Sequence, residues 1–168
     1  METIDITVFY LEMLAPSHRA VPAPRDGLTV TQVPTPSVPY YRSLHDAVGK
    51  DYHWLSRKNL SDEELAEILH DPRDELYVLH VDGTAAGFAD LDRRQPDEIE
   101  LVQFGLTGEF IGQGLGKWFL QWIIDKAWSY EPNRLWLHTC TLDHPAALPN
   151  YKKAGFVQFK EEASQKVF

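Results

Sequence analysis

Three glycines beside a lysine form the part of the sequence best suited to hold an anion. Gly112, Gly114 and Gly116 precede Lys117. The first turn of a helix has unpaired N–H groups and a partial positive charge, and glycines let an anion come close to the backbone. The spacing therefore predicts a phosphate-binding turn. The alternative is a helix that begins at a flexible glycine turn and binds nothing.

The spacing of these glycines excludes two common phosphate loops. A Walker A loop needs a glycine five residues before Gly116 and a Ser or Thr after Lys117, where this chain has Ile111 and Trp118. The dinucleotide fingerprint G-x-G-x-x-G fails as well, because its third glycine would fall on Lys117 or Phe119. What remains is a G-x-G turn at the start of a helix.

The elements around this turn have clear periodicity. Residues 98–106 alternate polar and apolar side chains, which predicts a strand. After the turn, apolar residues recur at the spacing of one helical face: Leu115, Trp118, Phe119, Trp122 and Ile123. The order is therefore strand, glycine turn, helix.

The glycine turn resembles the coenzyme A loop of the GNAT acetyltransferase superfamily, whose pattern is Gln/Arg-x-x-Gly-x-Gly/Ala. Gly114 and Gly116 match the small positions, whereas Ile111 stands in place of Gln or Arg. Residues 144–156, HPAALPNYKKAGF, resemble the second GNAT signature, a short helix that carries a Tyr and ends in Gly-Phe. The matching residues there are Ala147, Tyr151, Gly155 and Phe156.

Two residues depart from the second signature. His144 replaces the usual Asn near the helix start, and Pro149 lies inside the expected helix. Because proline removes one backbone hydrogen bond, we expect this helix to be kinked or to begin late. The resemblance covers about the C-terminal two-thirds of the chain.

The resemblance implies a mixed α/β fold, with a mostly antiparallel central sheet, flanking helices and strands splayed around an acyl-CoA slot. Residues 1–168 are then a single GNAT-like domain. The implied activity is transfer of an acetyl group from acetyl-CoA to a primary amine of a small molecule by direct attack, without a metal. The expected cofactor-binding residues are Leu106, Gly112, Gln113, Gly114, Leu115, Gly116, Lys117, His144 and Tyr151.

Glu100 is the candidate base. At an amine pKa near 10.4 only about one group in 2,500 is free at pH 7, a cost of about 4.6 kcal/mol. Glu98, Glu100, Val102 and Phe104 are expected to share one strand face, so apolar neighbours would raise the pKa of Glu100 towards a useful value. Glu100 also falls where some GNAT enzymes carry a base. The alternative is a surface glutamate, with water as the base.

Two other residues are expected to act on the thioester. Gly105, a glycine within a strand, is a common mark of a bulge. The resemblance implies that the bulged strand turns the N–H of Leu106 towards the thioester carbonyl. This single hydrogen-bond donor would stabilise the oxyanion by about 3 kcal/mol. Gly105 could instead be a packing glycine under Trp118 or Trp122. By the same resemblance Tyr151, with a phenol pKa near 10, is the acid for the departing thiolate. The alternative is that the Tyr151 side chain only packs in the core and has no catalytic role.

Other candidates carry less chemistry. His138, Cys140 and His144 suggest a metal site, but no fourth ligand is evident. Trp54, within the aromatic stretch 51–58, falls where the resemblance places the acceptor pocket. Ordinary packing explains that stretch as well.

Composition limits the remaining possibilities. The net charge of −9 argues against a nucleic-acid partner. One cysteine fits a reducing compartment, and no signal peptide or long apolar run is visible, so we expect a cytoplasmic chain without a membrane partner. The resemblance is compatible with a homodimer. It also leaves open a catalytically inactive acyl-CoA-binding sensor or scaffold, or an acetyltransferase of peptide or protein amines.

Local signals predict the rest of the chain. Ser61 and Glu64 form a capping box that starts a helix ending near His70, and Asp82-Gly83 is a hairpin turn. Residues 15–26 are expected to be a loop. The other expected elements are strands at 4–14, 28–33, 76–81, 84–91, 134–141 and 156–159 and a helix at 39–48.

Overall fold

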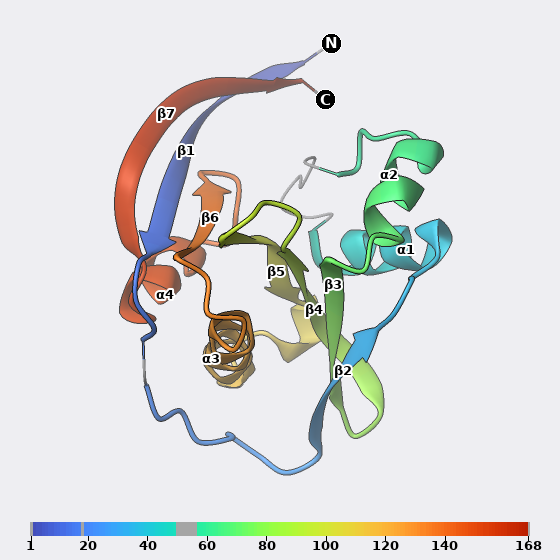
Figure 1. Cartoon of the computed structure of the whole chain (residues 1–168), viewed down its shortest axis with the longest axis vertical. Helices are drawn as coiled ribbons and strands as arrows, with labels where there is room; N and C mark the ends of the chain where they lie inside the picture. The colour runs from blue at the N-terminus through green and yellow to red at the C-terminus, as the bar shows by residue number, and fades with distance from the viewer. Residues whose placement is uncertain (1, 18, 50–56, 168) are drawn as a thin grey trace.

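The computed structural model describes residues 2–17, 19–49 and 57–167 and contains one seven-stranded sheet in the order β2-β3-β4-β5-β6-β1-β7. All pairs are antiparallel except β5 with β6. The predicted mixed α/β fold is confirmed (Figure 1). The elements are β1 (Thr3–Met13), β2 (Leu28–Val33), α1 (Val38–Gly49), α2 (Asp62–Leu69), β3 (Asp74–Val81), β4 (Thr84–Asp92), β5 (Glu98–Leu106), the short 3-10 helix η2 (Gly108–Phe110), α3 (Leu115–Trp128), β6 (Arg134–Cys140), α4 (Ala147–Lys153) and β7 (Val157–Val167).

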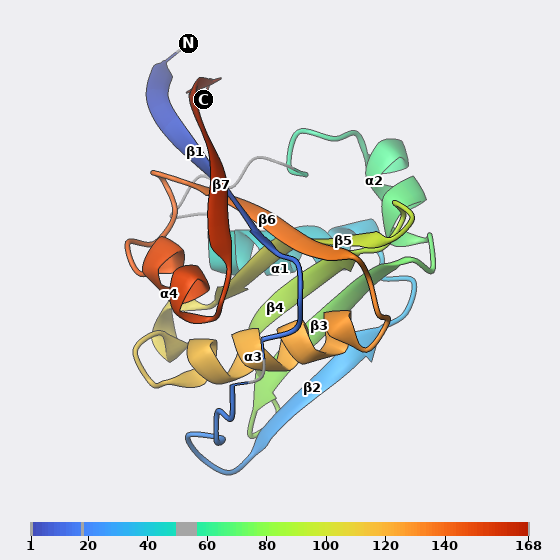
Figure 2. The ribbon, with the colours of Figure 1, turned by 60° about the vertical axis from the view of Figure 1, so that its left-hand side comes forward.

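The sheet separates two layers of helices. Figure 1 shows α3 and α4 on one side and α1 and α2 on the other, and Figure 2 shows α3 crossing the strands. The buried face of α3, including Phe119 and Ile123, packs with the sheet and with Tyr151 of α4. A smaller core joins α1 and α2 to β3 and β4. We call the side that carries α3 the cofactor face and the opposite side the acceptor face.

Several local predictions are confirmed. Ser61 and Glu64 form the reciprocal capping box at the start of α2. Asp82 and Gly83 both have positive φ, as the tight hairpin between β3 and β4 requires. The helix that contains Pro149 begins late, at Ala147, which places the proline in the first turn, where its missing N–H costs little.

The predicted bulge lies three residues away from its expected position. Asp90 pairs with Gln103 and Leu91 with Leu101, so Val102 is the extra residue of β5, whereas Gly105 pairs regularly with Phe88. The inserted residue reverses the alternation of side chains along the strand. Glu100 and Phe104 therefore face opposite sides of the sheet, and the prediction that they share one face is wrong.

The splay of β5 from β6 is present. The two strands pair only from Glu98 with Arg134 to Glu100 with Trp136, although both continue beyond these residues. Glu100 and Trp136 therefore lie side by side at the base of the split.

β7 is much longer than predicted. It continues past Phe159 to Val167 because β1 supplies a partner along its whole length, down to Thr3 opposite Val167. Figures 1 and 2 show the two strands curving together and both termini at the same end.

Within the described residues no helix is long and apolar enough to cross a membrane. Residues 51–56, with Trp54, lie outside the described part of the chain, so their predicted role stays a prediction.

Candidate active site

The glycine turn has the backbone that its sequence predicts. Gly112 and Gly114 have φ of 85° and 79°, in the left-handed region that glycine adopts without strain. Gly114 is the N-cap residue of α3 and has no side chain to bond to the N–H groups there. A Cβ on Gly112 would meet no atom within 4 Å. The turn therefore offers open backbone and a free helix start to an anion.

A cleft of about 400 Å³ connects this turn to α4. Its wall includes the end of β5 and the first residues of α4. Seven of the nine predicted cofactor-binding residues line it: Leu106, Gly112, Gly114, Gly116, Lys117, His144 and Tyr151. Gln113 and Leu115 do not line it, because Gln113 donates to the Glu109 carbonyl at 3.0 Å and Leu115 is buried in the core.

The backbone of Leu106 points into the split between β5 and β6. Leu106 lies opposite Gly87 of β4, and the next residue, Thr107, donates its N–H to the Ala86 carbonyl at 2.8 Å. Hydrogen-bonded and non-hydrogen-bonded pairs alternate in an antiparallel ladder, so Leu106 belongs to a non-hydrogen-bonded pair. Its N–H is therefore directed away from β4, to the side where β6 has separated.

Tyr151 is held rigidly beside the same split. Its ring packs edge-on against Phe104 at 6.3 Å and Phe156 at 6.1 Å between centroids. Burial, and then the negative charge of Asp143, raise the pKa of the Tyr151 phenol above its ordinary value. The phenol therefore keeps its proton at neutral pH and can donate a hydrogen bond.

The turn before α4 is fixed by two neighbouring side chains. His144 accepts a hydrogen bond from the Ala146 N–H at 3.0 Å through Nδ1, so it fills the position expected for Asn. Asp143 accepts from the hydroxyl of Thr139 and, at 3.0 Å, from the Cys140 N–H. Asp143 lines the cleft but was missed in the sequence, where its only signal is its position next to His144.

A second cavity, of about 170 Å³, continues from the cleft to the acceptor face. The two share Phe104, Asp143 and Tyr151, and the second also reaches Tyr10 of β1 and His138 of β6. Because its lining residues come from both β5 and β6, the cavity lies in the split between these strands. The split thus joins the two faces of the sheet.

Glu100 lies at the base of this split, on the acceptor face. Its Oε2 is 3.8 Å from Nε2 of His138, and its side chain is 21% exposed. Burial, and then the neighbouring charge of Asp92, raise the pKa of Glu100 to about 7. Burial lowers the pKa of His138. Glu100 can therefore take up a proton near neutral pH, and His138, which the sequence indicated only as a metal ligand, faces it.

The three residues considered as metal ligands are not brought together. His138 and Cys140 line the second cavity, and His144 lines the cleft. Across residues 2–17, 19–49 and 57–167, no group of three or more His, Cys, Asp or Glu side chains is placed to hold a metal ion.

Comparisons with known proteins agree with the fold. A model of the acetyltransferase (GNAT) family matches residues 39–156, which is more than half of the sequence. The chain therefore belongs to the GNAT acetyltransferase family. The match includes the glycine turn and Tyr151 but excludes β1 and all of β7.

Individual relatives are more distant. An uncharacterized N-acetyltransferase from the pepI 3′ region of Lactobacillus delbrueckii subsp. lactis is 25% identical over 153 residues, covering 80% of this chain and 87% of its own. A putative GNAT acetyltransferase structure from Novosphingobium aromaticivorans superposes with a TM-score of 0.65 and 17% identity, covering 96% of this chain and 64% of its own. An IAA acetyltransferase structure from Bacillus cereus superposes with a TM-score of 0.61 and 22% sequence identity, covering 79% of each chain.

These structures share the fold, and the chain spans less than two thirds of the length of the first structures that it matches.

Proposed function

We propose that this chain is an N-acetyltransferase that moves an acetyl group from acetyl-CoA to the primary amine of a small molecule. The single observation that carries the proposal is the cleft that joins an uncapped, glycine-lined helix start to Tyr151 through the split of β5 and β6. We take residues 1–168 as one domain, a proposal supported by a single sheet that includes both the first and the last strand.

The residues of the cleft fit coenzyme A. Its diphosphate needs N–H donors and positive charge, which the turn at Gly112 and Gly114 and the exposed Lys117 supply. The open space at Gly112, where a Cβ would meet nothing, allows the close approach that a phosphate needs. Its pantetheine arm would follow the apolar wall at Leu106 and Ala147 towards Tyr151.

The bound cofactor supplies a thioester whose carbonyl carbon accepts the amine. The N–H of Leu106 points into the split and donates to the carbonyl oxygen, which stabilises the negative charge that develops there. Glu100 takes the proton that the amine loses as the C–N bond forms. Tyr151 donates its phenolic proton towards the sulfur as the C–S bond breaks. Since the pKa of Tyr151 is raised, this donation is a hydrogen bond to the thiolate and not a complete transfer.

The experiment that tests this function follows thiol release from acetyl-CoA with a panel of primary amines. We expect CoA to stabilise the protein against heat and at least one small amine to release thiol. Stabilisation by CoA without thiol release from any amine would identify a binding protein, which is the sensor or scaffold alternative. Release with peptides alone would move the acceptor to protein amines. Failure to bind CoA would contradict the small-molecule acetyltransferase, the binding protein and the protein-amine acetyltransferase alike.

A further inference from the structure

A continuous row of aromatic rings leads away from the proposed base across the acceptor face. Trp136 lies next to Glu100 at the base of the split. The ring centroids of Trp136 and His138 are 6.4 Å apart, those of His138 and Tyr10 are 5.9 Å apart, and those of Tyr10 and Phe159 are 6.2 Å apart. We call these four residues the ring row. They come from three neighbouring strands, β6, β1 and β7.

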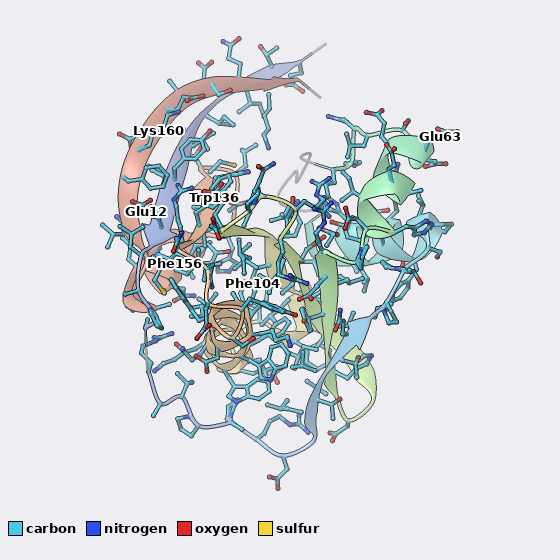
Figure 3. All side chains as sticks on the ribbon, in the orientation of Figure 1. Glu12, Glu63, Phe104, Trp136, Phe156 and Lys160 are labelled. Carbon is cyan, nitrogen blue, oxygen red and sulfur yellow. The ribbon has the colours of Figure 1, made fainter. Side chains whose placement is uncertain are left out.

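The strand pairing places the side chains of the ring row on the acceptor face. Tyr10 is the direct partner of His138, so the two side chains share a face. Phe159 is an extra residue in β7, because Tyr10 pairs with Lys160 and Leu11 with Gln158, and this bulge brings its ring over Tyr10. Figure 3 shows Trp136 beneath the curve of β1 and β7, on the side away from α3.

The ring row remains accessible. The side chain of His138 is 37% exposed and Phe159 is 44% exposed. Half of the row, Tyr10 and Phe159, comes from strands outside the matched part of the family. These rings extend a surface that begins at the proposed base.

The charges beside the ring row select against a polycation. Arg134 pairs with Glu12 at 2.8 Å and with Glu98 at 3.3 Å, and Asp92 pairs with Arg94 at 2.8 Å. Arg134 thus balances one of its two carboxylate partners, and Arg94 pairs with Asp92. What the surface offers is one carboxylate at the split, followed by rings beside which the protein already places cations. Arg134 lies 5.2 Å from the ring centroid of Trp136 and 5.0 Å from that of Phe159, and Lys160 lies 4.9 Å from that of Tyr10.

We propose that the ring row binds the body of the acceptor, and that the acceptor is a monoamine with a flat aromatic group. Its ammonium would lie between Glu100 and His138 and beside Trp136, where a carboxylate and an aromatic face both attract a cation. Its ring would pack on His138 and Tyr10. This proposal rests on the proposed function, because it assigns the acceptor of that same site.

The test compares two amines of nearly equal size, phenethylamine and 2-cyclohexylethylamine, titrated calorimetrically into the CoA-loaded protein. We expect phenethylamine to bind about tenfold more tightly, which corresponds to about 1.4 kcal/mol, because a ring pair adds energy of this order beyond its buried area. Tyr10→Leu should abolish most of this preference and leave CoA affinity unchanged. Tyr40→Leu is the matched control, because Tyr40 is an exposed tyrosine of α1.

Equal affinity for the two amines, an unchanged preference in Tyr10→Leu, or no amine binding would overturn the ring row as an acceptor site. So would a wild-type dimer that Tyr10→Leu converts to a monomer, because a second copy would then cover the rings. Thiol release separates the two proposals. Phenethylamine that binds as expected without releasing thiol contradicts the acetyltransferase and leaves the site standing. Thiol release with other amines, without a preference for phenethylamine, contradicts the ring row as the acceptor site and leaves the acetyltransferase standing.

Discussion

At the scale of single residues, the surroundings of Glu100 and Tyr151 fit opposite tasks. Both side chains are largely buried, and burial disfavours the charged form of each. For Glu100 the result is a pKa of about 7, at which a carboxylate can accept a proton and release it again. For Tyr151 it is a phenol that stays protonated. Glu100 lies at the base of the split, where β5 still pairs with β6, whereas Tyr151 lines both cavities farther along it.

Replacing Tyr151 by phenylalanine should separate binding from turnover. Tyr151→Phe keeps the ring that packs on Phe104 and Phe156, so we expect CoA affinity and stability to remain unchanged. The rate of thiol release should fall about a hundredfold, because the hydrogen bond to the departing sulfur is lost. Steady-state kinetics with a thiol reagent measure it. A variant with full turnover would remove Tyr151 from the mechanism.

The pH dependence of catalysis should show the titration of Glu100. Only its ionised form accepts a proton, so kcat/KM should rise as the pH passes through about 7. Glu100→Gln should lose that inflection and at least about a hundredfold in rate above it. The matched control is Glu67→Gln, on the exposed side of α2. If the inflection persists in Glu100→Gln, another group or water is the base.

At the scale of elements, the sequence predicted what local chemistry decides. The glycine turn, the capping box of Ser61 and the hairpin at Asp82 each depend on a few neighbouring residues, and all three are present. The position of the bulge was missed because Val102 has no unusual composition: the pairing of β5 with β4 creates the insertion. Gly105 was a plausible but incorrect marker.

The length of β7 was missed for a similar reason. Residues 160–166, KEEASQK, have no apolar alternation, and they form a strand because β1 pairs with them. The position of β1 between β6 and β7 likewise depends on contacts far apart in the sequence. The ring row could not be predicted, since it needs both this strand order and the bulge at Phe159.

The glycine turn can be tested with a matched pair of variants. Gly112 and Gly83 have nearly equal φ, 85° and 83°, and a Cβ on either would meet no atom within 4 Å. Alanine at each position therefore carries the same backbone strain, on the order of 1 kcal/mol. Only Gly112 lines the cleft. We expect Gly112→Ala to weaken CoA binding at least about tenfold and Gly83→Ala to leave it unchanged, by calorimetry.

Equal CoA affinity in both variants would show that Gly112 is needed only for the shape of the turn.

At the scale of the whole molecule, a buried ionic cluster joins the α1 layer to the sheet. Arg57 bonds to Asp74 at 2.9 Å and to Asp90 at 2.6 Å, and the hydroxyl of Tyr41 on α1 donates to Asp90 at 2.9 Å. Because one arginine cannot balance two buried carboxylates, the Asp74 and Asp90 pair keeps one proton that free carboxyls would have lost. Burial and this like-charge pair raise the pKa of Asp74 to about 8. The cluster lies between α1 and the sheet, on the acceptor face.

This cluster should make stability fall with rising pH. The folded pKa of Asp74 is above its unfolded value, so its contribution is complete below about pH 4 and is lost as the pH rises through 8. Between pH 7 and 9 we expect a loss of about 1 kcal/mol in the free energy of unfolding, from urea titrations. Asp74→Asn should remove most of this slope. The control Asp71→Asn, at a half-buried carboxyl whose pKa is lowered by hydrogen bonds from Arg73, should keep it, and an unchanged slope in Asp74→Asn would contradict the shared proton.

The central claim is that the backbone at the start of α3 binds the diphosphate of coenzyme A. The most direct measurement is a calorimetric comparison of acetyl-CoA with acetylpantetheine, which has the same thioester but no diphosphate. We predict that acetyl-CoA binds at least about a hundredfold more tightly, since most of the helix-start contacts would be to the missing group. Equal affinity for the two compounds, or no binding of either, would contradict the claim.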